Sequence, residues 1–252
     1  SMAFPVSLSM SLHDSSSSSQ SEAVVPFIPP VLDADRAAAI QARLDAQARP
    51  PGSLGRLESL AVQIGQILRT EAPRLQEPTV LLCAGDHGLV AQGVSAWPSS
   101  VTTLMMQGIL SGEATVSVLA RQHGLNVQVV DCGVIDPLPE QPGLVLRRVG
   151  AGTADALLQP AMTPEQCRTA IRNGREQVAS LPGNAILLGE MGIGNTSPAS
   201  LLLARLVGLP IEQVVGPGAG AGVVVGPGSG WAGELVVVGS ALGSPSLLAY
   251  TA

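Results

Sequence analysis

Residues 188–198, which read LGEMGIGNTSP, place a carboxylate, three glycines and a helix-start signal in one short connection. The apolar residues 185–188 ahead of it are typical of a buried strand. Behind it, residues 198–209 form a helical pattern, with Ser197 as the expected N-cap and Pro198 at the first helical position. A glycine-rich turn from strand to helix lets backbone N–H groups approach an anion. We therefore expect a nucleotide-handling loop in an α/β fold.

Glu190 lies inside this loop. Because a carboxylate repels a phosphate, its side chain is expected to face hydroxyl groups, a ribose or a cationic ring rather than the anion. The loop is expected to lie at the surface, so Glu190 is predicted to serve a ligand rather than the fold.

Strand-like and helical patterns alternate along the chain, which is typical of a parallel α/β sheet. The apolar runs 79–84 and 127–132 are expected to be two further strands. Helices are expected at 33–48, at 54–68, at 102–124 with a break near Ser111, and at 163–180 behind a capping box that begins at Thr163. Ligands of such folds collect at the carboxyl ends of the strands. We therefore expect three polar loops to meet there: 85–88, 131–133 and the Glu190 loop.

Composition excludes several classes of function. The 252 residues are 46% hydrophobic but only 2% aromatic, and the formal charge is -6. All 13 basic residues are arginine, so Schiff-base and P-loop chemistry that need lysine are excluded. The chain shows no basic stripe, which argues against nucleic-acid binding, and no apolar run long enough to predict a membrane span. Residues 1–29 are serine-rich and are expected to be a disordered leader rather than a signal peptide.

The candidate metal ligands and nucleophiles are scattered. Asp86-His87 could form a dyad or bind a metal, but no second histidine is near in sequence, so a structural or substrate-lining role is favoured. The three cysteines have no C-x-x-C pair and are interpreted as buried reduced thiols. Trp97 could stack on a flat heterocycle or could simply fill the core. Arg147-Arg148 could clamp an anion or could be a solvated pair.

Five motifs together go beyond this general chemistry. They resemble, in their order and spacing, the nicotinate-nucleotide:dimethylbenzimidazole phosphoribosyltransferase family, over about residues 30–218. The motifs are PGSLGRLE at 51–58, AGDHG at 84–88, GVS at 93–95, PAMT at 160–163 and GEMGIGNT at 189–196.

The resemblance implies a Rossmann-like parallel sheet with flanking helices in a large domain, residues 73–218, and a small helical N-terminal part, residues 30–72. It also implies a cytoplasmic homodimer. The implied reaction transfers phosphoribose from nicotinate mononucleotide to 5,6-dimethylbenzimidazole, which gives α-ribazole 5'-phosphate and nicotinate for the lower ligand of cobalamin. The positively charged ring nitrogen already activates the leaving group, so neither a metal nor a cofactor is expected.

The resemblance also implies positions for the substrates. Ser95 and Trp97 would line the benzimidazole pocket, and Glu190 would lie along the nicotinate ribose. Gly216 and Gly218 would begin a phosphate-binding turn. The full set of expected substrate-binding residues is Asp86, His87, Ser95, Trp97, Glu190, Met191, Gly192, Gly194, Asn195, Gly216 and Gly218.

The chain departs from the family pattern in its last part. Family members continue to an RLGEG-like segment whose glutamate is the general base, and this segment is absent from the sequence. Residues 219–252 form instead a glycine-rich, atypical tail, which is interpreted as a truncation or frame change near 218–220, so that the C-terminal part of the family fold is missing. Leu104 and Asp155 stand where the family commonly has glutamine and asparagine. A non-catalytic nucleotide- or benzimidazole-binding fragment is therefore the alternative to an enzyme, and an unstable fragment is a third possibility.

Overall fold

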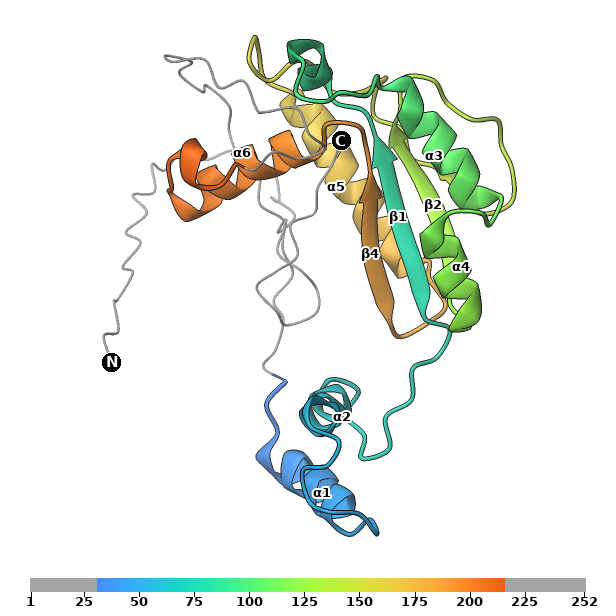
Figure 1. Ribbon diagram of the computed structural model, residues 1–252, viewed down its shortest axis with the longest axis vertical. Coiled ribbons are helices and arrows are strands. Elements are labelled where there is room, and N and C mark those ends of the chain that lie inside the picture. The colour runs from blue at the N-terminus through green and yellow to red at the C-terminus, as the bar shows by residue number, and fades with distance from the viewer. Residues whose placement is uncertain (1–30, 216–252) are drawn as a thin grey trace, which may run out of the picture.

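The computed structural model describes residues 31–215 of the chain, and the expected leader at 1–29 and tail at 219–252 lie outside them. Its centre is a four-stranded, wholly parallel sheet with strand order β3-β2-β1-β4 (Figure 1). The strands are β1 (Thr79–Gly85), β2 (Asn126–Gly133), β3 (Leu144–Leu146) and β4 (Ile186–Met191). This confirms the predicted α/β class and its parallel sheet.

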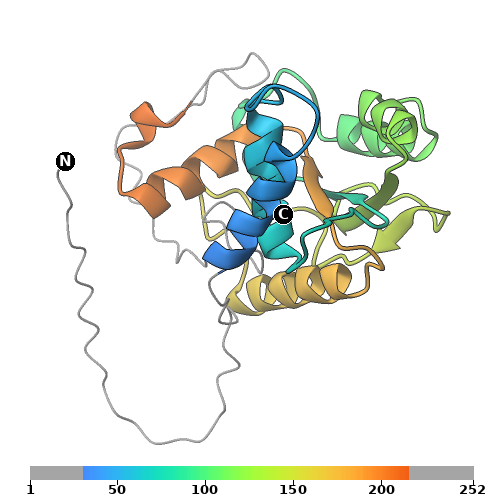
Figure 2. The ribbon, with the colours of Figure 1, turned by 90° about the horizontal axis from the view of Figure 1, so that it is seen from below.

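Helices cover both faces of this sheet (Figure 2). On one face, α3 (Ser100–Leu110) and α4 (Thr115–Gln122) close the core, where Met106 and Ile109 pack with Leu82 and Val129. On the other face lies α5 (Pro164–Ala179), which begins with the predicted capping box at Thr163. The break expected near Ser111 is confirmed, because α3 ends there and α4 begins four residues later.

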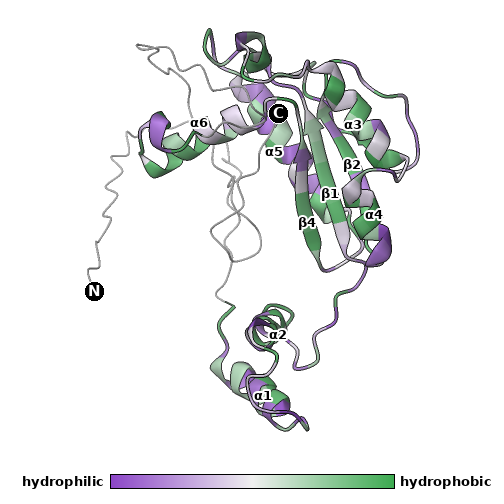
Figure 3. Ribbon diagram, in the orientation of Figure 1, coloured by the Kyte–Doolittle hydropathy of each residue, from purple (hydrophilic) through white to green (hydrophobic). Residues whose placement is uncertain are grey.

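The strands are apolar because both of their faces are covered (Figure 3). In β1 every residue except Cys83 is buried. The edge strand β4 is more exposed, with Leu187 and Leu188 each nearly half accessible, because β1 is its only partner among the described strands.

Two helices form a hairpin beyond the amino ends of the strands (Figure 1). They are α1 (Ala34–Asp45), capped by the Asp33 side chain, and α2 (Arg56–Ile67). A side chain at Gly65 would collide with Ile40, so this glycine allows the two helices to approach closely. The turn of the PGSLGRLE motif is held by the buried Glu58, which accepts hydrogen bonds from Arg49 and from the Leu54 N–H group.

The helix after β4 differs from the prediction at its start. Helix α6 (Thr196–Val207) begins before Pro198, and Asn195 rather than Ser197 is its N-cap residue. The reason is that the Ser197 N–H group donates to the Gly194 carbonyl oxygen and the Ala199 N–H group to that of Asn195, so Pro198 lies within the first turn, where its missing N–H group is tolerated. Strand β4 also runs farther than predicted, because its pairing with β1 continues through Glu190 and Met191. The hydroxyl of Ser197 is buried without a hydrogen-bond partner instead of capping the helix. Short 3-10 turns at Gly88–Gln92 and Ile211–Gln213, and strand β3, had no clear sequence signal.

Candidate substrate site at the carboxyl ends of the strands

Asp86 connects three segments just after β1. Its carboxylate is almost completely buried and accepts a hydrogen bond from the Thr102 hydroxyl at 2.6 Å and another from the Ile135 N–H group at 2.8 Å. Thr102 Oγ1 in turn accepts from the Ile193 N–H group at 3.1 Å. Asp86 therefore holds helix α3, the loop after β2 and the loop after β4 in one arrangement. Its role is to position these loops.

His87 lies against the loop after β4. A Cβ atom added at Gly192 would come within 2.3 Å of the Gly85 carbonyl oxygen and 2.9 Å of His87 Nε2, which shows how tightly the two loops pack. Burial lowers the pKa of His87 to about 4, so the imidazole is neutral at physiological pH. The two carboxylate oxygens of Asp86 accept hydrogen bonds from the Thr102 hydroxyl and the Ile135 N–H group, so this carboxylate holds the surrounding segments together.

Glu190 stands near the end of β4, opposite Cys83 of β1. Its carboxylate accepts a hydrogen bond from the side-chain amide of Asn195, the N-cap residue of α6. Asn195 therefore orients the Glu190 side chain. Burial raises the pKa of Glu190 to about 7, although the residue as a whole is exposed. A carboxyl group with this pKa changes charge near neutral pH and is accessible to a ligand.

The segment after His87 folds back onto the same loop. A side chain at Gly194 would meet Val90 and Val94, which places the Gly88–Gln92 turn beside it. Ser95 follows directly, and its Oγ accepts a hydrogen bond from the Trp97 N–H group at 3.1 Å. The Trp97 side chain is 58% exposed, so the interpretation of this residue as core filling is wrong.

A glycine turn that sequence reasoning did not place in the site closes the arrangement. The Thr153 N–H group donates to the Asp86 carbonyl oxygen at 3.0 Å, and Thr153 Oγ1 accepts from the Gly88 N–H group at 3.3 Å. Asp155 accepts from the Gln92 amide at 2.5 Å. The sequence marks this segment as a turn through Gly150-Ala151-Gly152. It does not reveal the hydrogen-bond partners of Thr153 and Asp155, which lie more than 60 residues away in the chain.

Arg148 is neither a solvated side chain nor an anion clamp. Its guanidinium contacts the carboxylate of Asp131 at 2.7 Å, and the Asp131 side chain is fully buried. The second oxygen of Asp131 accepts the N–H groups of Gly133 at 2.9 Å and Val134 at 3.0 Å. The carboxylate therefore holds the loop after β2, and the predicted polar loop at 131–133 is structural. The cysteines are free but partly exposed rather than buried.

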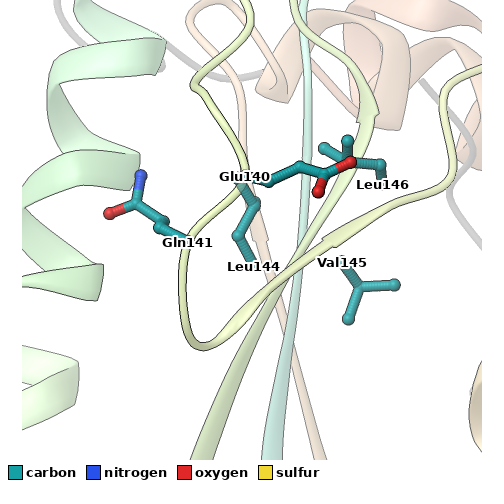
Figure 4. Close-up of a pocket in the computed structure, with 5 residues that line it drawn as sticks. All are labelled: Glu140, Gln141, Leu144, Val145 and Leu146. Carbon is teal, nitrogen blue, oxygen red and sulfur yellow. The ribbon is translucent and has the colours of Figure 1, made fainter.

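A hollow of about 550 Å³ lies elsewhere, along the opposite edge strand β3 (Figure 4). It is open and is lined by Glu140, Gln141, Leu144, Val145 and Leu146, with a single charged side chain. None of the predicted site residues lines it. Within residues 31–215, no three His, Cys, Asp or Glu side chains gather closely enough to hold a metal ion, and no helix is long and apolar enough to cross a membrane.

Comparison with known proteins decides the family. A family described as phosphoribosyltransferase matches residues 29–230. The chain belongs to this family. A relative from Variovorax paradoxus, named nicotinate-nucleotide--dimethylbenzimidazole phosphoribosyltransferase, is 58% identical over 200 residues, which are 79% of this chain and 57% of the relative. A relative of the same name from Cupriavidus necator is 48% identical over 198 residues, 77% of this chain and 57% of its own length.

Solved structures of this phosphoribosyltransferase family agree. CobT from Thermus thermophilus matches with a TM-score of 0.70 and 40% identity, over 75% of this chain and 57% of that one. A second structure from the same organism is named nicotinate-nucleotide-dimethylbenzimidazole phosphoribosyltransferase. It matches with a TM-score of 0.70 and 38% identity, over 79% of this chain and 64% of that one. The chain thus spans a little over half the length of these curated relatives. The family resemblance seen in the sequence is confirmed.

The structure thus brings most of the predicted substrate-binding residues to one end of the sheet. The segments carrying Asp86, His87, Ser95 and Trp97 and those carrying Glu190, Met191, Gly192, Gly194 and Asn195 are linked by the hydrogen bonds and close approaches described above. Gly216 and Gly218 lie outside the described residues. The substrate-binding roles of all these residues remain predictions.

The raised pKa of Glu190 predicts a pH-dependent stability. Between pH 4.5, its ordinary value, and about 7, the folded chain keeps a proton that the unfolded chain has lost, so this group makes the fold less stable as pH rises. Glu190→Gln removes the titration while keeping an acceptor for Asn195. We expect its melting temperature to equal that of the wild type at pH 4.5 and to exceed it above pH 7. Thermal denaturation across this range measures the difference. Glu113→Gln, at an exposed position, controls for the loss of a charge, and a constant offset at every pH would contradict the prediction.

Proposed function

We propose that this chain transfers phosphoribose from nicotinate mononucleotide to 5,6-dimethylbenzimidazole, giving α-ribazole 5'-phosphate and nicotinate in the synthesis of the lower ligand of cobalamin. The observation that carries the proposal is the 58% identity over 200 residues to a relative named for these substrates. The linked loops at the carboxyl ends of β1 and β4 support it, because parallel sheets bind their ligands there.

The reaction needs positioning more than acid-base strength. A benzimidazole ring nitrogen attacks the anomeric carbon as the bond to nicotinate breaks, and nicotinate leaves as a neutral pyridine ring with inversion at that carbon. The proton on the other ring nitrogen of the benzimidazole then passes to water. Because the leaving ring is already cationic, binding geometry and electrostatics supply most of the catalysis. In our proposal the Glu190 carboxylate faces the ribose hydroxyls or the cationic ring, and Asn195 fixes its orientation.

An anionic group of the nucleotide, its phosphate or the nicotinate carboxylate, would lie at the turn between β4 and α6, beside the phosphate-binding turn that the resemblance implies at Gly216 and Gly218. Residues 192–195 carry two glycines and lead into a helix of 12 residues, whose N-terminal N–H groups favour an anion. Gly192 has no room for a side chain, so the backbone of this turn is fixed by its packing on His87 and Gly85. The neutral His87 adds no charge of its own and so leaves the electrostatics to the backbone and Glu190.

Trp97 is proposed to bind the benzimidazole, and this gives a testable prediction. The indole ring is exposed on a segment whose Val94 side chain lies beside the loop after β4. Trp97→Ala is expected to weaken the affinity for 5,6-dimethylbenzimidazole about tenfold, since an aromatic pair adds roughly 0.5–1.5 kcal/mol beyond the buried area. Isothermal titration measures it, with Trp97→Phe as the variant that retains most of the affinity. An equal loss of affinity for nicotinate mononucleotide would argue against a role specific to the base.

The proposed reaction is tested directly on the purified chain. Incubation with nicotinate mononucleotide and 5,6-dimethylbenzimidazole, followed by chromatography and mass measurement, detects α-ribazole 5'-phosphate. We expect product, and its loss in Glu190→Ala. Nucleotide affinity without product, while the Variovorax paradoxus relative makes product under the same conditions, would overturn the proposed activity and leave a binding function for the loops.

A homodimer is also proposed. The α1-α2 hairpin exposes apolar side chains of α2 and its preceding turn: Leu54, Leu57, Leu60 and Ile67. An exposed apolar stripe on an amphipathic helix is typical of a contact between proteins. Light scattering coupled to size-exclusion chromatography measures the mass, and a monomer at all concentrations would contradict this proposal.

A further inference from the structure

Two cysteines lie close together beneath the candidate site. Cys83 belongs to β1 and Cys132 to the neighbouring β2, and Cys83 is in register with Val130. Cys132 follows Val130 by two residues, at the point where the register of the two strands shifts. The two thiols are in contact with each other, and the Cys132 S–H group donates to the Val130 carbonyl oxygen at 3.7 Å. This arrangement is not used by the proposed reaction.

The two thiols are not equivalent. The hydrogen-bonding contact with Cys132 lowers the pKa of Cys83, whereas the same contact and burial raise the pKa of Cys132. Glu190 of β4 is in register with Cys83 of β1, and the negative charge of its carboxylate raises the pKa of Cys83. The hydrogen bond is the larger influence. The pair thus consists of one thiol suited to attack and one that stays protonated beside it.

We propose that Cys83 and Cys132 form an oxidisable thiol pair that hydrogen peroxide converts into a disulfide. The Cys83 thiolate attacks one oxygen of the peroxide, the O–O bond breaks, and the released hydroxide takes up a proton to become water. The Cys132 sulfur then attacks the sulfenic sulfur of Cys83, the S–O bond breaks, and a second water leaves with the Cys132 proton. Two thiols lose two electrons, and both peroxide oxygens end as water.

An irregularity in the sheet makes this bridge feasible. A regular offset of two residues between neighbouring strands would separate the Cα atoms by about 8 Å, beyond the roughly 4.4–6.8 Å that a disulfide spans. The register shifts at this point, because Ala84 pairs with Asp131 but Gly85 pairs with Gly133. Cys132 is therefore the extra residue of a bulge, which shortens its offset from Cys83 along the strand.

The sequence makes the proposal simple to test. Trypsin places each cysteine in a different peptide, since cleavage at arginine gives residues 75–121, 122–147 and 149–168. The reduced full chain is treated with a small molar excess of hydrogen peroxide, remaining thiols are alkylated, and the digest is analysed by mass. We expect one intramolecular link, between peptides 75–121 and 122–147, and an alkylated Cys167. Dithiothreitol should restore three alkylated cysteines.

Matched variants decide which sulfur attacks. Cys132→Ser should leave a Cys83 sulfenic acid that dimedone captures, whereas Cys83→Ser should leave Cys132 as an alkylated thiol. Cys167→Ser should form the link as the wild type does, and its circular dichroism together with that of the other two variants shows whether each chain is folded. A link that includes Cys167, a link between two chains, or no link while Cys83 is oxidised further would each overturn the proposal.

Discussion

Gly192→Ala is expected to weaken the affinity for nicotinate mononucleotide about 100-fold, because a displacement of roughly 1 Å at a positioning element has effects of that size. The added Cβ atom would lie 2.3 Å from the Gly85 carbonyl oxygen and 2.9 Å from His87 Nε2. The first of these is a backbone atom inside the sheet and cannot move aside. The loop after β4 must therefore shift, and it would carry Glu190 and Asn195 away from the nucleotide. Isothermal titration measures the affinity.

A second glycine supplies the control for this experiment. Gly108 lies in helix α3, where an added Cβ atom meets nothing within 4 Å. Gly108→Ala should therefore leave the affinity unchanged and stabilise the chain by up to about 1 kcal/mol through helix propensity. If Gly192→Ala bound the nucleotide as the wild type does, the loop after β4 would not be part of the binding site.

The parallel sheet could be predicted because its signals are local. Each central strand is a continuous apolar run, and each is followed by a polar or glycine-rich loop, so the general rule for such sheets placed Asp86 and Glu190 at one end. The capping box at Thr163 was also readable, because all of its hydrogen bonds lie within one turn.

The start of helix α6 was predicted two residues too late, because two local signals compete there. Ser197 and Pro198 are a good start signal, yet Asn195 precedes them and its carbonyl oxygen already accepts from the Ala199 N–H group, so the helix begins at Thr196. Strand β3 was missed for a different reason. It has three residues and exists only through its pairing with β2.

The connections within the site were hidden from sequence reasoning as well. Thr102 joins Asp86, 16 residues away, to Ile193, 91 residues away, and nothing in a helical pattern marks one threonine as such a link. Arg148 was misread because its partner Asp131 lies on another strand. Residue types and loop positions were predictable, whereas partners that are distant in the chain required the fold.

Asp86→Ala is expected to lower the free energy of unfolding by about 3 kcal/mol, since it leaves the buried Thr102 hydroxyl and the partly buried Ile135 N–H group without their acceptor, and an unsatisfied buried group costs roughly 1–3 kcal/mol. Against a total stability of roughly 5–15 kcal/mol, this removes a large share. Urea denaturation measures it. Asp136→Ala, at an exposed neighbouring position, should change little.

The double variant separates this role from simple loss of packing. If the cost of Asp86→Ala comes from the stranded Thr102 hydroxyl, then adding Thr102→Val removes that hydroxyl and the two changes together should cost less than their sum. If the cost came only from lost packing, the unfolding free-energy costs of the two substitutions would add or would exceed their sum. The nucleotide should still bind poorly to the double variant, because Ile193 in the loop after β4 has lost Thr102 Oγ1 as the acceptor for its N–H group. Additive costs with normal nucleotide affinity would show that Asp86 does not hold these loops together.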